Sequence, residues 1–259
     1  MPLDLDLLVM AYANGVFPMS DARDDPETFW IEPERRAILP LDGLKLSKSL
    51  RKTIRRDRFT VTADIAFDRV IATCAETAAD RRDTWINEDI EQAFRILHAR
   101  GLTHSVECWQ DGELVGGLYG LALGGAFFGE SMFSRRTDAS KVALAWLVAR
   151  LRLGGFRLLD CQFMTDHLAT LGAVEISQAA YLSLLARAVP GDPRSIADQI
   201  VSSGSSGSGT SASSGASSVT GDWSSFDRLL APDGVSVVTP SSVSSSPGKL
   251  ILQSLTQTS

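Results

Sequence analysis

Three features that often reveal a protein's class are scarce in this sequence: cysteine, histidine and long apolar runs. The three cysteines, Cys74, Cys108 and Cys161, are far apart and odd in number, so they suggest neither a disulfide framework nor a zinc motif. No apolar run approaches the roughly 20 residues that a bilayer-spanning helix needs. The N-terminus lacks the basic start of a signal peptide. We therefore expect a cytoplasmic protein with no membrane segment and no metal site.

Positive charge is also in short supply overall, because the 259 residues carry a formal net charge of −6. The basic residues are nevertheless concentrated at 35–58, where nine of them accompany only Asp42 and Asp57. A local basic strip suits a polyanion, since each neutralised phosphate releases counterions. A solvated helix face would explain the same composition.

Composition divides the chain into three parts. Their expected bounds are 1–42 for a small N-terminal domain, 43–190 for the main domain and 191–259 for a C-terminal extension. The Ser- and Gly-rich stretch 202–218 is typical of a flexible linker. Two short segments beyond it, 222–230 and 246–259, could dock weakly onto the main domain.

Turn signals and hydrophobic periodicity predict an α+β fold. An Asp-Gly pair at 111–112 and a Gly-Gly pair at 124–125 divide residues 103–134 into three strands of an antiparallel meander. A helix opened by Asp138 follows, and "FRLLDCQ" should return parallel to the third strand. The order βββαβαβ matches acetyltransferase-like (GNAT-type) folds, which have one bent mixed sheet with flanking helices.

One carboxylate, Glu130, interrupts the apolar run "GGAFFGESMF" near the end of the third strand. A carboxylate is costly to bury without a partner, and ligands favour strand ends. If "LLDCQ" lies beside this strand, Asp160 and Gln162 share a face by alternation while Cys161 points away. The three polar side chains would then cluster in an apolar cleft. A surface position for Glu130, or a pair with a nearby basic residue, would fit the spacing equally well.

Long blocks of the sequence, in order, are familiar. They are "LLVMAYANGVFPM", "FWIEPERRAIL", "TWINEDIEQAFRILHARGLTHSVECW", "ELVGGLYGLALGGAFFGESMFS", "DASKVAL" and "LLDCQFMTDHLATLGAVEI". Over most of residues 5–185 the chain resembles the bacterial leucyl/phenylalanyl-tRNA–protein transferases. The resemblance implies transfer of Leu or Phe from charged tRNA to proteins that begin with Arg or Lys, marking them for degradation (the N-degron pathway). It also implies a small N-terminal domain beside an acetyltransferase-like domain.

The resemblance also implies roles for individual residues. The catalytic ones would be Glu130, Gln162 and Asp160, with Asp160 as the partner of the glutamine. Residues near the aminoacyl-adenosine end and its apolar side chain would be Trp30, Trp85, Leu118, Phe127 and Leu144. Contacts to tRNA phosphates would come from the basic strip, through Arg35, Arg36, Arg51, Lys52, Arg55 and Arg56.

The implied chemistry needs no cofactor, because the donor is an activated ester and amide formation from it runs downhill. Gln162 is a neutral amide, so it could orient the amine or donate to the oxyanion but not act as the base. Glu130 or Asp160 could take the proton, or the leaving ribose could relay it. Either carboxylate could also attract the basic first residue of the acceptor. Nothing in this scheme requires more than a monomer.

Two other functions compete with this interpretation. A coenzyme-A-dependent N-acetyltransferase would need a glycine-rich pyrophosphate loop, and the segment "SRRTDASK" at 134–141 has no glycine. A non-catalytic RNA-binding module could use the basic strip but would not need an acid–amide cluster.

Overall fold

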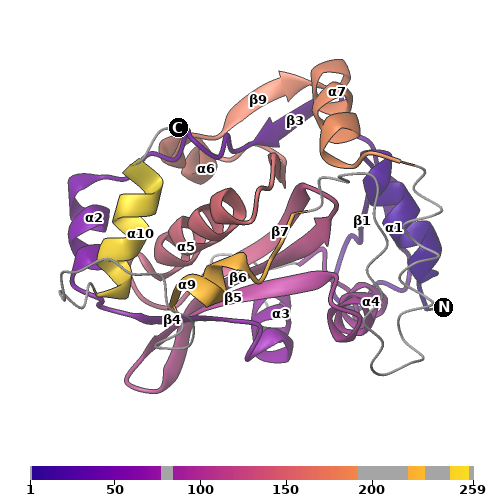
Figure 1. Ribbon diagram of the computed structural model, residues 1–259. Helices are drawn as coiled ribbons and strands as arrows, with labels where there is room; N and C mark the ends of the chain where they lie inside the picture. Colours follow the sequence, from indigo (N-terminus) through magenta and orange to yellow (C-terminus); the bar gives the residue numbers. More distant parts are fainter. Residues whose placement is uncertain (1, 77–83, 192–220, 231–245, 257–259) are drawn as a thin grey trace, which may run out of the picture.

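The computed structural model describes residues 2–76, 84–191, 221–230 and 246–256. These residues form a two-stranded sheet and a seven-stranded sheet with helices on both faces (Figure 1). The strands are β1 (Phe17–Met19), β2 (Phe29–Ile31), β3 (Arg35–Ile38), β4 (Thr60–Ala63), β5 (Thr103–Gln110), β6 (Glu113–Leu123), β7 (Ala126–Ser134), β8 (Leu158–Gln162) and β9 (Val174–Ser177). The helices are α1 (Leu5–Ala13), α2 (Lys48–Arg55), α3 (Phe67–Ala75), α4 (Glu88–Ala99), α5 (Ala139–Leu153), α6 (Asp166–Leu171), α7 (Gln178–Ala188), α9 (Ser225–Leu230) and α10 (Pro247–Thr256).

The predicted meander is confirmed: β5, β6 and β7 pair antiparallel in chain order. Its first turn uses Asp111 and Gly112 at φ 54° and 81°, the left-handed region that Asp and Gly tolerate best. Helix α5 then crosses over, and β8 pairs parallel to β7 as expected. The sheet order β4-β5-β6-β7-β8-β3-β9 places β7 at the centre of a mixed sheet.

The strand β3, within the expected N-terminal domain 1–42, belongs to the main sheet. It lies between β8 and β9 in the main sheet and pairs antiparallel with both. Pro33 and Pro40 frame a short piece of chain that the sequence predicts to be extended, and Ala37 and Ile38 are buried there. The N-terminal segment therefore contributes a strand to the larger sheet, and the boundary expected at residue 42 lies beyond that strand.

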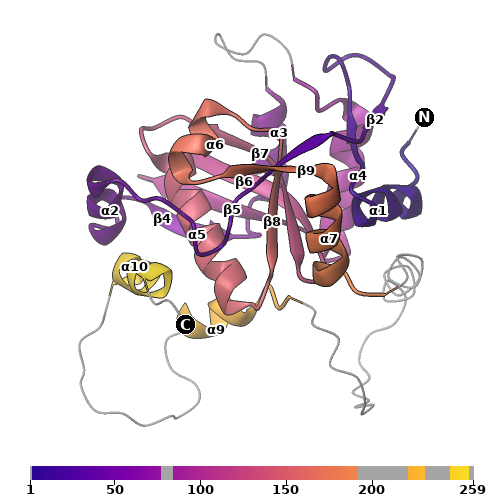
Figure 2. The same cartoon turned by 90° about the horizontal axis from the view of Figure 1, so that it is seen from above.

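Two apolar cores lie on opposite faces of the sheet. Adjacent residues of β7 point to opposite sides, so Phe128 joins the core beneath α1, α3 and α4, while Phe127 joins the one beneath α5. Figure 2, seen from above, shows α5 on one side of the central strands and α1, α4 and α7 on the other. This arrangement buries β7 on both faces, so a polar residue there needs a partner or a cavity.

The two C-terminal segments are more than weakly attached. Helices α9 and α10 pack on α5, and α10 also packs on α2. Phe226 and Ile251 are buried, and the Trp223 indole stacks on His104 with ring centroids 4.2 Å apart. Arg150 holds Asp227 through two hydrogen bonds of 2.8 and 2.5 Å. The predicted linker 202–218 lies outside the described residues.

Candidate functional site

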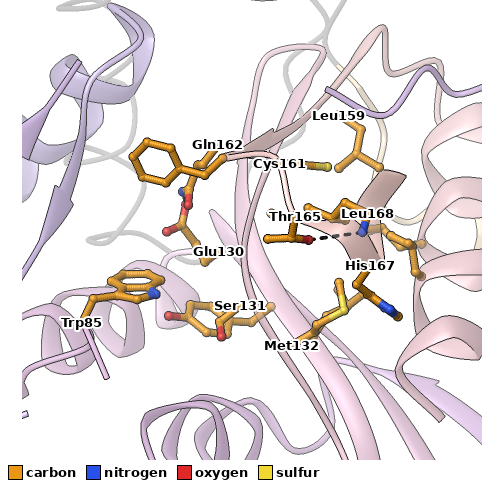
Figure 3. A pocket seen from close by; sticks show the side chains of 16 residues that line it. Trp85, Glu130, Ser131, Met132, Leu159, Cys161, Gln162, Thr165, His167 and Leu168 are labelled. Carbon is orange, nitrogen blue, oxygen red and sulfur yellow. Dashed lines mark hydrogen bonds between the residues drawn. The ribbon is translucent and has the colours of Figure 1, made fainter. Parts of the chain in front are cut away.

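A cavity of about 290 Å³ opens where β7 and β8 separate (Figure 3). The parallel ladder ends at the pair Phe128–Asp160, and beyond it the two strands continue without pairing with each other. Apolar side chains from the sheet, α5 and α6 form most of the lining, among them Leu118, Met132, Leu144, Leu147, Leu159 and Leu168. The separated strands leave space between them for a ligand, beside the polar side chains of Glu130 and Gln162.

Glu130 enters this cavity because β7 carries a bulge. Gly129 pairs with Gly120 and Ser131 pairs with Tyr119, so Glu130 has no partner on β6. A bulged residue re-aims its side chain and bends the strand. The facing glycine makes the bend feasible: a Cβ at Gly120 would lie 2.2 Å from the Phe128 carbonyl oxygen.

Glu130 and Gln162 meet in the cavity, as their side chains show in Figure 3. The Gln162 amide donates to Glu130 Oε1 at 2.9 Å. Glu130 is only 7% exposed, and within the described structure its Oε2 has no hydrogen-bond partner. Burial raises the pKa of Glu130 to about 8, although the hydrogen bond from Gln162 acts in the opposite direction. The cavity lining therefore contains one carboxyl group, and one of its two oxygens lacks a hydrogen-bond partner in the described structure.

The backbone of Gln162 explains why Cys161 does not point away as predicted. Gln162 has φ 62°, which ends the extended geometry on which strict alternation depends. Cys161 and Gln162 therefore both line the cavity. Burial raises the pKa of the Cys161 thiol, so the sulfur stays protonated and is a poor nucleophile.

Asp160 lies behind the cavity rather than in its lining. It is fully buried, and it forms a salt bridge with Arg36, which is 1% exposed. Tyr181 also donates to Asp160 Oδ2 at 2.8 Å. Both carboxylate oxygens are occupied, so Glu130 is the carboxyl group that faces the cavity.

Arg36 itself corrects one prediction. The basic strip suggested a surface contact for tRNA, but the side chain points from β3 into the protein. Its neighbour Arg35 is exposed and pairs with Glu175 at 3.0 Å. The remaining four predicted contacts are exposed on α2 or directly after it, namely Arg51, Lys52, Arg55 and Arg56. A surface role stays a prediction for these residues.

The predicted substrate residues divide into two groups. Trp85, Leu118 and Leu144 line the cavity. Phe127 does not: it is fully buried and stacks on Trp223 at 5.5 Å. Trp30 is 38% exposed on β2 and is also not among the lining residues. Phe127 packs in the core beneath α5, together with Leu118 and Leu144, and its role beside the substrate stays a prediction.

Sequence reasoning missed Tyr12, which is buried near Glu130. Its hydroxyl interacts with Glu130 without reaching hydrogen-bond geometry, and burial raises its pKa. His167 also lines the cavity, and partial burial and the charge of Lys141 lower its pKa. Within the described residues there is no group of three or more metal-ligating side chains, and no helix is long and apolar enough to cross a membrane.

Comparison with known proteins identifies the family. The sequence profile described as "Leucyl/phenylalanyl-tRNA protein transferase" matches residues 38–186, and the profile of its N-terminal domain matches residues 1–34. The chain belongs to this family. Its members' name describes an aminoacyltransferase, so the chain is an enzyme of that class. The gap between the two matches, 35–37, lies in β3.

Relatives named leucyl/phenylalanyl-tRNA–protein transferase support this assignment. One from Rhizorhabdus wittichii is 64% identical over 183 residues, 71% of this chain and 74% of the relative. One from Paramagnetospirillum magneticum is 63% identical over 188 residues, which cover 73% of this chain and 90% of the relative. One from Novosphingobium aromaticivorans is 51% identical over 256 residues, which cover 98% of this chain and 96% of the relative. A solved structure, L-PGS from Bacillus licheniformis, aligns at 12% identity over 72% of this chain and 58% of its own, with a TM-score of 0.36 that carries no argument about fold.

Proposed function

We propose that this chain transfers Leu or Phe from charged tRNA to the N-terminal Arg or Lys of acceptor proteins, which marks them for degradation in the N-degron pathway. The observation that carries the proposal is the cavity's combination of an apolar lining with one unpartnered carboxyl oxygen, on Glu130. The apolar part suits the donor side chain and the carboxylate suits a cationic acceptor. Because the donor is charged tRNA, we place the reaction in the cytoplasm.

The transfer step forms one bond and breaks one. The acceptor's α-amine attacks the ester carbonyl, the C–N bond forms, and the C–O bond to the ribose breaks. The proton lost by the amine ends on the ribose oxygen, with the Glu130 carboxylate receiving it first. The pKa of Glu130, about 8, lies close to that of an α-amine at about 7.7–8, so this proton transfer is nearly balanced.

Gln162 orients the reacting groups and does not take the proton. Its amide already donates to Glu130, which fixes the carboxyl group beside the substrate. Asp160 acts through Gln162, since its oxygens are occupied within the protein. In this proposal Glu130 is the proton acceptor and the other two residues hold the geometry.

The donor pocket is formed by leucine side chains, including Leu118 and Leu144. An apolar pocket discriminates weakly between apolar ligands, so both Leu and Phe are accepted. Trp85 lines the same cavity, which supports its proposed stacking on the terminal adenine. Trp30, on an exposed strand, remains a candidate for the same end of the tRNA.

The tRNA body binds through the exposed basic residues of α2. Positive side chains on one helix contact phosphates with little base reading, as A-form RNA favours. No cofactor is needed because the ester supplies the driving force, and a single chain carries the whole proposed site. The opening between β7 and β8 and the order of the elements also support an acetyltransferase-like arrangement.

The test is transfer of labelled Leu from Leu-tRNA to a peptide that begins with Arg, beside one that begins with Ala. Acetyl-coenzyme A serves as the control donor. Label on the Arg peptide alone, and from tRNA alone, is the expected result. Acetylation without transfer from tRNA would replace the proposal with an N-acetyltransferase.

A further inference from the structure

Behind the Glu130–Gln162 pair lies a buried ionic group that does not face the cavity. Arg36 donates to Asp160 through Nε at 2.9 and 3.0 Å and through Nη2 at 2.6 Å. Tyr181 adds a hydroxyl donor at 2.8 Å. Breaking such a buried pair leaves an uncompensated charge, so its geometry is held tightly.

The group connects directly to the backbone of Gln162. The Gln162 N–H donates to Asp160 Oδ1 at 2.8 Å, and this residue has φ 62°. A left-handed conformation is unfavourable for a residue with a side chain, so it needs support from its surroundings. Asp160 supplies that support, and the resulting backbone direction points the Gln162 amide at Glu130.

Arg36 is itself fixed from three sides. Its Nη1 donates to the Gly15 carbonyl oxygen at 2.9 Å. Its guanidinium lies over the rings of Phe17 and Tyr181, 4.6 and 4.5 Å from their centroids. The N-terminal segment, the strand β3 and α7 therefore all converge on the orientation of Asp160.

We propose that Arg36 and Tyr181 are positioning residues for Gln162, acting through Asp160, an inference that rests on the proposed role of Gln162 and Glu130. They touch no substrate and move no proton. Arg36 pairs with Asp160 and aligns its carboxylate, and Asp160 holds the left-handed Gln162 through its backbone N–H. Misplacement of a reacting group by about 1 Å can cost on the order of 100-fold in rate, so loss of this support lowers kcat.

The first test is Arg36→Lys, which keeps the charge and removes the planar fork. We expect kcat to fall by about 10- to 100-fold, with KM for Leu-tRNA within about threefold of wild type. Arg150→Lys is the matched control, because Arg150 is also buried and forms a two-bond pair with an aspartate, Asp227, outside the cavity lining. The control should lose stability and keep kcat. A rise in KM for Leu-tRNA with unchanged kcat would instead indicate that Arg36 contributes to tRNA binding, and it would overturn the inference.

A double-mutant cycle separates positioning from general damage. If Arg36 acts through Gln162, Arg36→Lys/Gln162→Ala has the kcat of Gln162→Ala alone. If the double variant instead shows the product of the two single losses in kcat, the inference is overturned and the proposed function is left intact. Wild-type kcat in Gln162→Ala would overturn both the inference and the site assignment, while transfer to the Arg peptide would still support the function. If Arg36→Lys fails to fold, Tyr181→Phe enters the same cycle, with an expected loss of about threefold to tenfold and the same two outcomes.

Discussion

Replacing Glu130 by glutamine should improve the stability of this enzyme while removing most of its activity. The folded protein raises the pKa of Glu130 from 4.5 to about 8, chiefly by burial. The folded state therefore binds the proton more tightly than the unfolded chain does. The contribution of this carboxyl group to folding stability is fully present below pH 4.5 and is lost as the pH rises from there through about 8.

The size of this effect follows from the shift. Between pH 5.5 and 8.5 the buried carboxyl group should cost the folded state about 3 kcal/mol, an order-of-magnitude figure from proton linkage. Glu130→Gln removes the titration and keeps the shape, so its advantage over wild type should grow by about that amount across this range. For a domain of this size the melting temperature should diverge by roughly 6–12 °C.

The assay combines urea unfolding at the two pH values with single-turnover transfer from Leu-tRNA. Loss of a positioned proton acceptor should lower the rate by about 10²- to 10⁴-fold. Glu107→Gln is the control, because Glu107 is also fully buried but has both oxygens bonded, to Thr62 and Ser105. It should leave the transfer rate unchanged. A Glu130→Gln variant that transfers Leu at the wild-type rate would refute the assignment of the proton acceptor.

Three further predictions concern other parts of the molecule. Arg51→Ala/Arg55→Ala should raise KM for Leu-tRNA and reduce its salt dependence, measured from 50 to 200 mM salt, without changing kcat, because both residues are exposed on α2; a lower kcat with unchanged KM would argue against a tRNA contact. Phe226→Ala should cost about 3–5 kcal/mol in urea unfolding and keep kcat, since its ring is buried against α5 and lies outside the cavity lining; unchanged stability would mean that α9 does not contribute to the core. Leu144→Ala should enlarge the donor pocket and raise kcat/KM for Phe-tRNA relative to Leu-tRNA by about tenfold, measured in competition; an unchanged ratio would remove Leu144 from the pocket.

The central meander could be predicted because its signals are local. Asp111 and Gly112 specify the first turn through their own conformational preferences, and Gly124 does so for the second. The parallel placement of β8 followed from the length of the crossover helix and the rule for its handedness. Each of these inferences needs only neighbouring residues.

The features that were missed depend on partners far away in the sequence. The four-residue strand β3 can be predicted as a short extended piece between prolines, but its place in the main sheet cannot, because its partner strands lie more than a hundred residues away. Arg36 carries the same charge as its exposed neighbours, so composition cannot reveal that it is buried. The bulge at Glu130 is defined by which residues pair on β6, and one strand alone does not contain that information.

The two carboxylates near the cavity have similar burial and opposite electrostatic surroundings. Asp160 is compensated by Arg36 and bonded by Tyr181, so its charge is satisfied before any substrate arrives. Glu130 has one neutral amide donor and an unpartnered oxygen, so its ionisation awaits a cation from outside. An acceptor's ammonium group would supply that cation at the place where its proton must leave. The two carboxylates therefore differ in how their charge is compensated rather than in how deeply they are buried. This difference assigns a structural role to Asp160 and a catalytic role to Glu130.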